Sequence, residues 1–317
     1  MKKITILDTS IASENIGDFI IMDSVNRELK KIFSLDMLFY SLTHDKISKA
    51  TYRLNKISDY TFIGGTNLLS SNMNSYNQWK INFIDSLFLK DTILMGVGWW
   101  QYQKKPNLYT QYLLKKVLHS RIMHSVRDSH TEQMLRSIGI NNVINTGCMT
   151  MWDLTKEHCH KIPVIKSDNV IFTLTDYNQD VINDQILIDT LIKNYVNVYF
   201  WPQGSGDLAY IRSLNNIENI SILGGNLFAY DQLLEDTTIS LDFIGTRLHA
   251  GIRALQKKRR TIILGIDNRA KEKARDFNLK VINREDIATL EDTLISDFST
   301  EICINEENIT RWKNQFL

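Results

Sequence analysis

The chain of 317 residues has little cysteine and no long apolar run. Its three cysteines, Cys148, Cys159 and Cys303, lack CxxC spacing, which argues against a disulfide framework and a structural zinc site. No stretch approaches the roughly 20 apolar residues that a membrane-spanning helix requires. The apolar run after Met1 is also too short for the core of a signal peptide. We therefore expect a cytoplasmic protein with reduced thiols and no transmembrane segment, and peripheral association with the inner face of a membrane stays open.

An excess of charge is also lacking, since 37 Lys and Arg residues stand against 36 Asp and Glu residues. A net charge of +1 gives no overall field that would attract nucleic acid. We expect no nucleic-acid partner, and any anion site must be local. The hydrophobic fraction of 43% is typical of a folded protein, and the length favours two domains of roughly 150 residues each.

Short β-rich runs alternate with amphipathic patterns, which is typical of parallel sheets with crossover helices. The expected strands are 4–7, 60–63, 92–96, 170–174, 196–201, 238–241 and 261–264. The expected helices include 19–33, 108–119, 129–138, 184–194 and 248–256. A polar stretch at 155–169 indicates a linker. The prediction is an α/β protein with two facing doubly wound, Rossmann-like domains, 1–160 and 161–317, and an active cleft between them.

The most informative segment is 242–254, DFIGTRLHAGIRA, in which a strand runs through Gly245 and Thr246 into a helix. A helix N-terminus has free N–H groups, and Arg247 adds a bidentate donor for carboxylate or phosphate. His249 can move protons near neutral pH. The alternative is structural, with Arg247 in a salt bridge between the domains and His249 as a half-buried ring with its hydrogen bonds satisfied.

This segment resembles the GTRLH signature of polysaccharide pyruvyl transferases, a family with a GT-B-like fold. Four further segments, in the same order as in the family, resemble its other motifs, one of them the strand-end turn at Gly96, Val97 and Gly98. The other three carry candidate site residues. They are the NxGD element at Asn15, Gly17 and Asp18, the glycine-rich turn at Gly64, Gly65, Thr66 and Asn67, and the RD element at Arg127. Many members have glycine where this chain has Thr66. Taken singly, these segments are also compatible with tight turns, helix caps or a local ion pair.

The resemblance implies a transferase that moves the enolpyruvyl group of phosphoenolpyruvate onto sugar hydroxyls, forming a pyruvate ketal in capsule, exopolysaccharide or O-antigen biosynthesis. It implies His249, Arg247 and Asp18 as catalytic residues. Substrate binding is implied for Asn15, Gly17, Gly64, Gly65, Thr66, Asn67, Arg127, Gly245, Thr246 and Arg269. Phosphoenolpyruvate is the expected donor and a nucleotide-linked, lipid-linked or polymeric sugar the acceptor, with no further cofactor and no metal. The acceptor would lie on the N-terminal domain and phosphoenolpyruvate on the C-terminal one, with the last helix packing back on the N-terminal domain.

One departure concerns the family's Asp-x-Lys element, which reads Asp267, Asn268, Arg269 here. Arginine keeps the charge but does not transfer protons, so only anion binding would remain, unless Lys271 substitutes. Two other functions stay open, a GT-B nucleotide-sugar glycosyltransferase and a non-catalytic sugar- or nucleotide-binding protein, because fold does not decide function. The acceptor sugar and the oligomeric state are not predicted.

Overall fold

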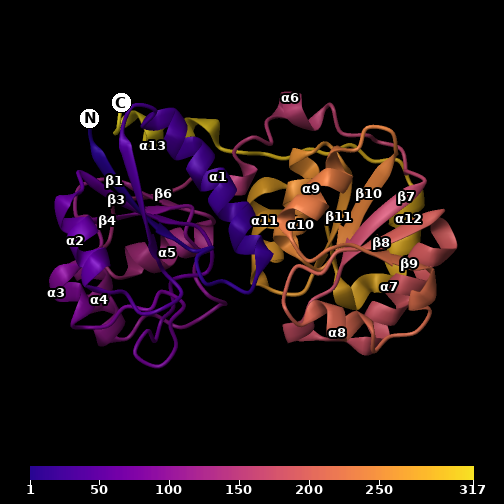
Figure 1. Ribbon diagram of the computed structural model, residues 1–317, viewed down its shortest axis with the longest axis horizontal. Helices are drawn as coiled ribbons and strands as arrows, with labels where there is room; N and C mark the ends of the chain where they lie inside the picture. The colour runs from indigo at the N-terminus through magenta and orange to yellow at the C-terminus, as the bar shows by residue number, and fades with distance from the viewer. The chain divides into compact units, whose positions relative to one another are not determined.

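The computed structural model describes residues 1–317 and divides into two compact units (Figure 1). Unit 1 comprises Met1–Ser13, Ile21–Trp152 and Ile304–Leu317, and unit 2 comprises Glu14–Ile20 and Asp153–Cys303. Helix α1 (Ile16–Ile32) therefore begins in unit 2 and continues in unit 1. No helix is long and apolar enough to cross a membrane.

Unit 1 is built on a parallel sheet of four strands in the order β2-β1-β3-β4. These strands are β1 (Lys3–Asp8), β2 (Met37–Leu42), β3 (Tyr60–Gly64) and β4 (Thr92–Met95). A parallel pair, β5 (His124–Val126) and β6 (Val143–Asn145), continues beyond β4 through the bridge of Val97 to Val126. The helical elements are α2 (Lys49–Ile57), α3 (Asp85–Phe88), α4 (Leu108–Val117), α5 (Ser129–Ser137), η1 (Met149–Met151) and α13 (Glu306–Asn314).

The C-terminal helix α13 packs within unit 1. Trp312 and Phe316 are buried, and their rings lie 6.0 and 5.2 Å from the ring of Phe62 in β3. The indole N–H of Trp312 donates to the carbonyl of Met123 at 2.8 Å, and Lys313 pairs with the buried Glu28 of α1. Burying aromatic rings is the largest local source of stability, so this helix closes the core of unit 1.

His124, at the start of β5, predicts a pH dependence of stability. Its ring is fully buried, with Nδ1 accepting from the N–H of Leu94 at 3.2 Å and Nε2 bonded to the carbonyl of His119 at 2.9 Å. Burial lowers the pKa of His124 to about 4. The unfolded chain therefore binds a proton that the native state excludes, and stability present above pH ~6.5 is lost as the pH falls toward ~4.

The expected loss is about 3 kcal/mol over that interval. Urea unfolding between pH ~7 and ~4 measures it, and His124→Asn, which keeps an acceptor but does not titrate, is expected to flatten the pH slope. The exposed His160 supplies the control, since His160→Asn should leave the slope unchanged. Equal slopes for wild type and His124→Asn would contradict the prediction.

Unit 2 contains a parallel sheet of six strands in the order β12-β11-β10-β7-β8-β9. The strands are β7 (Asn169–Thr173), β8 (Asn197–Phe200), β9 (Ile220–Ile222), β10 (Leu241–Gly245), β11 (Arg260–Gly265) and β12 (Val281–Asn283). The helical elements are α6 (Lys156–Cys159), η2 (Asp176–Asn178), α7 (Val181–Asn194), α8 (Asp207–Ile211), η3 (Ile217–Asn219), α9 (Leu227–Glu235), α10 (Leu248–Gln256), α11 (Asn268–Phe277), η4 (Arg284–Thr289) and α12 (Leu290–Ile295). The two sheets confirm the predicted parallel α/β class.

One predicted strand was misplaced. The run 238–241 was expected to be a strand, but β10 begins only at Leu241. Thr238 is instead held in a turn, where its N–H and hydroxyl both donate to the carboxylate of Asp236. The strand includes the buried Asp242, which pairs with Arg260 of β11 at 2.9 Å.

Candidate active site

Four loops of unit 2 follow strand ends at one edge of its sheet. Because all six strands are parallel, the carboxyl ends of β7, β8, β10 and β11 lie at the same edge, where open α/β sheets bind ligands. The residues that follow these ends include Asp176, the 203–207 loop, Arg247 and Arg269. This edge therefore brings four separate stretches of sequence to one place.

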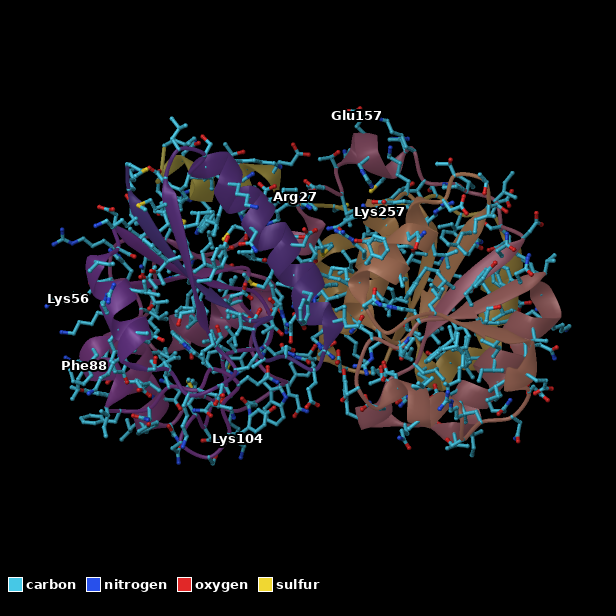
Figure 2. All side chains as sticks on the ribbon, viewed as in Figure 1. Arg27, Lys56, Phe88, Lys104, Glu157 and Lys257 are labelled. Carbon is cyan, nitrogen blue, oxygen red and sulfur yellow. The ribbon has the colours of Figure 1, made fainter.

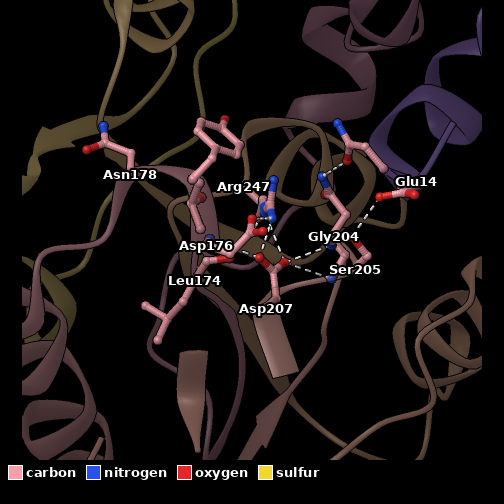
Figure 3. Close-up of polar contacts among 12 residues, drawn as sticks. Glu14, Leu174, Asp176, Asn178, Gly204, Ser205, Asp207 and Arg247 are labelled. Atoms are coloured by element: carbon pink, nitrogen blue, oxygen red, sulfur yellow. Dashed lines mark hydrogen bonds and ion pairs between the residues drawn. The ribbon is translucent and has the colours of Figure 1, made fainter. Parts of the chain in front are cut away.

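Arg247 lies at the centre of this edge and is only 4% exposed (Figure 3). Its guanidinium forms a two-point ion pair with Asp207, in which Nε lies 3.0 Å from Oδ2 and Nη2 contacts Oδ1. Nη2 also donates to Asp176 at 2.7 Å, and Nε to the carbonyl of Leu174 at 3.1 Å. The ring of Tyr177 lies 5.1 Å from the guanidinium carbon. None of the hydrogen bonds uses Nη1, so that nitrogen can still donate to a ligand.

Asp207 ties this ion pair to the loop that follows β8. Its carboxylate accepts from the N–H groups of Gln203 at 3.1 Å, Gly204 at 2.8 Å and Asp176 at 3.1 Å. Burial raises the pKa of Asp207, and its contacts with Arg247 and the backbone oppose that rise. The salt bridge considered for Arg247 therefore exists, but inside unit 2.

Gly204 is required by the close approach of Arg247. A Cβ at this position would overlap Nη2 of Arg247. We expect Gly204→Ala to push the guanidinium away from Asp207 and to lower any activity that uses Arg247 by about 10²-fold, which is what misplacing a reacting group by about 1 Å can cost. A Cβ at Gly225 would meet only Pro202, at an ordinary 3.6 Å.

Gly225→Ala is therefore the matched control and should retain the wild-type rate in an initial-rate assay. Both variants are first compared by thermal unfolding, to separate loss of activity from loss of fold. Wild-type turnover in Gly204→Ala would show that the position of Arg247 does not matter for transfer.

The predicted NxGD element meets the same loop. The amide Nε2 of Gln203 donates to Oδ1 of Asn15 at 2.8 Å, and the N–H of Gly17 donates to the same oxygen at 3.0 Å. Asn15 also forms a β-bridge with Gly204. A Cβ at Gly17 would approach Nε2 of Gln203 to 2.8 Å, and Asp18 is buried at the start of α1. Asn15 and Gly17 therefore lie next to the 203–207 loop, and Asp207 of the same loop pairs with Arg247.

Gln203 is a residue that the sequence analysis did not select for the site. Its side chain is 3% exposed, and its Oε1 has no hydrogen-bond partner, whereas its Nε2 is used by Asn15. A buried acceptor without a partner is costly, and this oxygen lies beside Asn15 with its hydrogen-bonding capacity unused.

Gly245 and Thr246 shape the turn between β10 and α10. A Cβ at Gly245 would come within 2.7 Å of the backbone N and O of Thr173 in β7. Thr246 is buried, and its hydroxyl lies 2.8 Å from that of Thr175. Both residues hold the two strand ends together, so the structure assigns them packing contacts next to Arg247.

His249 occupies the second position of α10 and is 5% exposed. The helix begins directly after Arg247, and no side chain caps its first turn. Its first N–H groups are therefore not bonded by a capping side chain and, with the positive end of the helix dipole, favour an anion. His249 thus lies in the first turn of a helix whose N-terminus is not capped by a side chain.

Arg269 joins the same edge through Tyr177. Nη2 of Arg269 and the Tyr177 hydroxyl are 2.5 Å apart, and the guanidinium also pairs with Asp267, the N-cap of α11. Tyr177 therefore lies next to both Arg269 and Arg247. Burial opposes the charge of Arg269, but Asp267 and Tyr177 outweigh it and raise the pKa above its usual value, which leaves no proton-transfer role there.

The other residues predicted for the site belong to unit 1; they are Gly64, Gly65, Thr66, Asn67 and Arg127. Gly64 ends β3, and Gly65 has φ +33, where a Cβ would overlap Ile21. Thr66 has φ +61, an uncommon conformation for a β-branched residue, at the place where many family members have glycine. Asn67 is 8% exposed, and its Oδ1 has no hydrogen-bond partner.

Arg127 is buried at 2% exposure in unit 1. Its Nε pairs with Asp128 at 2.8 Å, and Asp128 caps α5 by accepting from the N–H of Thr131. A Cβ at Gly98 would overlap the guanidinium, so this glycine leaves room for the arginine. The ion pair between neighbours considered from the sequence is therefore present, and it orients the arginine next to the Gly98 turn.

Comparison with known proteins was made against this geometry. The family model described as "Polysaccharide pyruvyl transferase" matches residues 15–268. The S. aureus MnaA–UDP co-structure is similar with a TM-score of 0.53 and 10% identity, over 100% of this chain and 91% of that chain. UDP-GlcNAc 2-epimerase from Neisseria meningitidis bound to UDP-GlcNAc has a TM-score of 0.46 and 13% identity, over 100% of this chain and 94% of that one. Curated proteins give no match.

The likeness to MnaA shows the fold alone and confirms the expected GT-B-like class. The family match is more informative, because it begins at Asn15 and includes both the 203–207 loop and the GTRLH segment. At the edge of the unit 2 sheet the match includes Asp176, the 203–207 loop and Arg247, which contact one another, and it ends one residue before Arg269. The chain belongs to the polysaccharide pyruvyl transferase family.

Proposed function

We propose that the chain transfers the enolpyruvyl group of phosphoenolpyruvate to two hydroxyls of a sugar, forming a pyruvate ketal in a surface polysaccharide. The observation that supports this proposal most is His249 beside the Arg247 ion pair, at the uncapped start of α10. A proton-moving group next to an anion-binding helix end is what this reaction needs.

In the first step, a sugar hydroxyl oxygen bonds to C2 of phosphoenolpyruvate while C3 accepts a proton. In the second, another hydroxyl of the same sugar displaces phosphate from C2, which closes the ketal and releases inorganic phosphate. Each step takes one proton from a hydroxyl. We assign the proton transfers to His249, because an imidazole both accepts and donates protons near neutral pH.

The donor's carboxylate and phosphate need cationic or N–H donors. In unit 2 we assign this role to Nη1 of Arg247, to the first N–H groups of α10 and to Arg269. Asp176 and Asp207 offset the charge of Arg247, so directed hydrogen bonds rather than net charge would hold the anion. In unit 1, Arg127 and the Gly64–Asn67 turn are our candidates for substrate contacts.

We assign the acceptor hydroxyls to the 15–18 segment and Gln203. The Oε1 of Gln203 would gain its missing hydrogen bond from a sugar hydroxyl, and Asp18 would orient or deprotonate one. A sugar carries several neighbouring hydroxyls. The neutral amide oxygen of Gln203 and the carboxylate of Asp18 could therefore each accept a hydrogen bond from one hydroxyl of a diol.

Ligand-induced thermal stabilisation tests the donor. A ligand that binds only the native state raises stability by RT ln(1 + [L]/Kd), about 2.7 kcal/mol at one hundred times Kd. We expect phosphoenolpyruvate to raise the melting temperature. UDP-, GDP- and CMP-sugars are expected to leave it unchanged, except for a nucleotide sugar that is itself the acceptor. Stabilisation by one nucleotide sugar but not by phosphoenolpyruvate would favour a glycosyltransferase. Stabilisation by a sugar with no turnover of either donor would favour a binding protein.

A further inference from the structure

The short helix α3 in unit 1 has the reverse of the usual polarity. Its polar residues Asp85 and Ser86 are buried, at 6% and 1% exposure. Its apolar residues Leu87 and Phe88 are 50% and 54% exposed. Single exposed apolar side chains are common, but a turn that buries its polar side chains and exposes its apolar ones is not explained by folding.

Hydrogen bonds hold this turn in place from the inside. The carboxylate of Asp85 accepts from the hydroxyl of Tyr52 in α2 at 2.5 Å and from the N–H of Asn82 at 2.7 Å. Asn82 in turn accepts from the N–H groups of Ile84 and Asp85. The ring of Phe88 stacks on Tyr52 with centroids 5.1 Å apart. The turn is therefore anchored, and its apolar side chains are presented outward.

Neighbouring side chains extend this exposed surface. Phe83 and Tyr112 of α4 stack with centroids 5.5 Å apart, and both are more than two-fifths exposed. We define the α3 patch by its six exposed members: Phe83, Ile84, Leu87, Phe88, Leu108 and Tyr112. These six residues lie on or beside α3 or on α4, the helix that contacts it, and apolar side chains exposed together mark interaction sites.

The stretch of sequence that carries the α3 patch is strongly basic, although the protein as a whole is nearly neutral. Residues 80–121 contain seven cations, Lys80, Lys90, Lys104, Lys105, Lys115, Lys116 and Arg121, against two acids, Asp85 and Asp91. The carboxylate of Asp85 is buried and accepts a hydrogen bond from the hydroxyl of Tyr52. Figure 2 shows Lys56 and Phe88 projecting outward at the same side of unit 1, on which Figure 1 places α2, α3 and α4.

A cavity of about 650 Å³ opens beside the patch. Phe88 and Leu87 line it together with Arg53, Lys56 and Lys90, opposed by Asp59 and Asp91. The cavity is also lined by Tyr60, the first residue of β3, and Asp91 directly precedes β4. The cavity therefore lies at the amino ends of these two strands. The Gly64–Asn67 turn follows the carboxyl end of β3, at the opposite edge of the sheet. The patch is thus separate from the substrate contacts proposed for unit 1.

We propose that the α3 patch docks unit 1 onto the surface of a membrane that contains anionic phospholipid. Aromatic and aliphatic side chains would enter the headgroup boundary, and the surrounding lysines would face the lipid phosphates. The cations beside the patch, Arg53, Lys56, Lys90 and Lys116, outnumber Asp59 and Asp91 and argue for this partner, because they complement an anionic surface and would repel a second copy of the same patch. The inference does not depend on the proposed donor, since membrane docking and transfer are measured separately.

Vesicle co-sedimentation tests the proposal with the full-length chain. We expect binding to vesicles of phosphatidylcholine mixed with phosphatidylglycerol, little binding to phosphatidylcholine alone, and weakening as salt rises from about 0.1 M to 1 M. The double variant Ile84→Ser, Leu87→Ser leaves the Phe88–Tyr52 stack intact and should bind the anionic vesicles at least about tenfold more weakly. Lys90→Glu combined with Lys116→Glu should weaken binding by a similar factor.

The control is Ile182→Ser with Phe228→Ser, two apolar side chains of unit 2 that are 75% and 77% exposed. It should bind vesicles as wild type does, and all variants should melt at the wild-type temperature. No binding of wild type to anionic vesicles, or binding as strong as that of wild type by both Ile84→Ser, Leu87→Ser and Lys90→Glu, Lys116→Glu, would overturn the proposal. A wild-type dimer in sedimentation equilibrium that Ile84→Ser, Leu87→Ser dissociates would instead assign the patch to a second copy.

Discussion

His249→Ala is expected to lower pyruvyl transfer by about 10²- to 10⁴-fold while the protein stays folded, which is the range that general acid–base catalysis contributes. The ring lies in the first turn of α10, next to Arg247, and α10 is held by its apolar face against the sheet. Steady-state rates measure the effect, and circular dichroism with thermal unfolding checks the fold.

A second variant separates proton transfer from packing. His249→Gln retains hydrogen-bonding groups but does not titrate, so it should be nearly as inactive as His249→Ala. The control is His158→Ala, because His158 bonds to the carbonyl of Leu255 at the other end of the same helix, at 2.8 Å. Wild-type turnover in either His249 variant would remove this residue from the mechanism.

Arg247→Met should cause the largest loss of stability, about 3–5 kcal/mol at neutral pH, because it removes one partner from a buried ion pair. The carboxylate of Asp207 is fully buried and would lose both guanidinium contacts, while Asp176 would lose one. Arg247→Lys keeps a charge but not the two-point pairing, so a smaller loss of stability together with weaker donor binding is expected. Urea unfolding gives the free energies.

The double variant Arg247→Met, Asp207→Asn tests the cause of this loss of stability. If the loss arises from an unpaired buried carboxylate, removing that charge should recover part of it, with a coupling energy of about 0.5–3 kcal/mol. Strictly additive losses in the two single variants would contradict the ion pair seen in the structure. So would an Arg247→Met protein as stable as wild type.

The alternation of apolar runs was enough to predict two parallel sheets, because buried parallel strands are continuously apolar. It failed where a strand contains a buried charge. In β10, Oδ2 of Asp242 accepts from Arg260, Tyr195 and the N–H of Ser167, and these partners come from three other parts of the chain. Periodicity alone cannot distinguish such a residue from a turn, so the strand was placed too early.

Short strands were missed for a related reason. β5, β6, β9 and β12 have only three residues each, which is too few for a period to be recognised. Helix α11 was also missed, because most of its residues are charged and few apolar ones mark its buried face. Its N-cap Asp267 is a residue type that commonly begins a helix.

For the candidate site, the sequence selected Arg247 and Asn15 but not what connects them. Asp207 and Asp176 follow strand ends, yet an isolated aspartate after a strand is most often a helix cap or turn residue. Their role depends on contacts with Arg247 across 40 and 71 residues of chain. Gln203 and Gly204 became recognisable only when the orphan Oε1 and the clash of an added Cβ with Arg247 were seen.

The most direct test of the proposed function is phosphate release from phosphoenolpyruvate in the presence of a panel of sugar acceptors, with wild type compared with His249→Ala. We predict release that requires an acceptor bearing two neighbouring hydroxyls, yields one phosphate per ketal formed, and is lost in the variant. No phosphate release with any acceptor, while a nucleotide sugar is consumed by the same preparation, would contradict pyruvyl transfer by this chain.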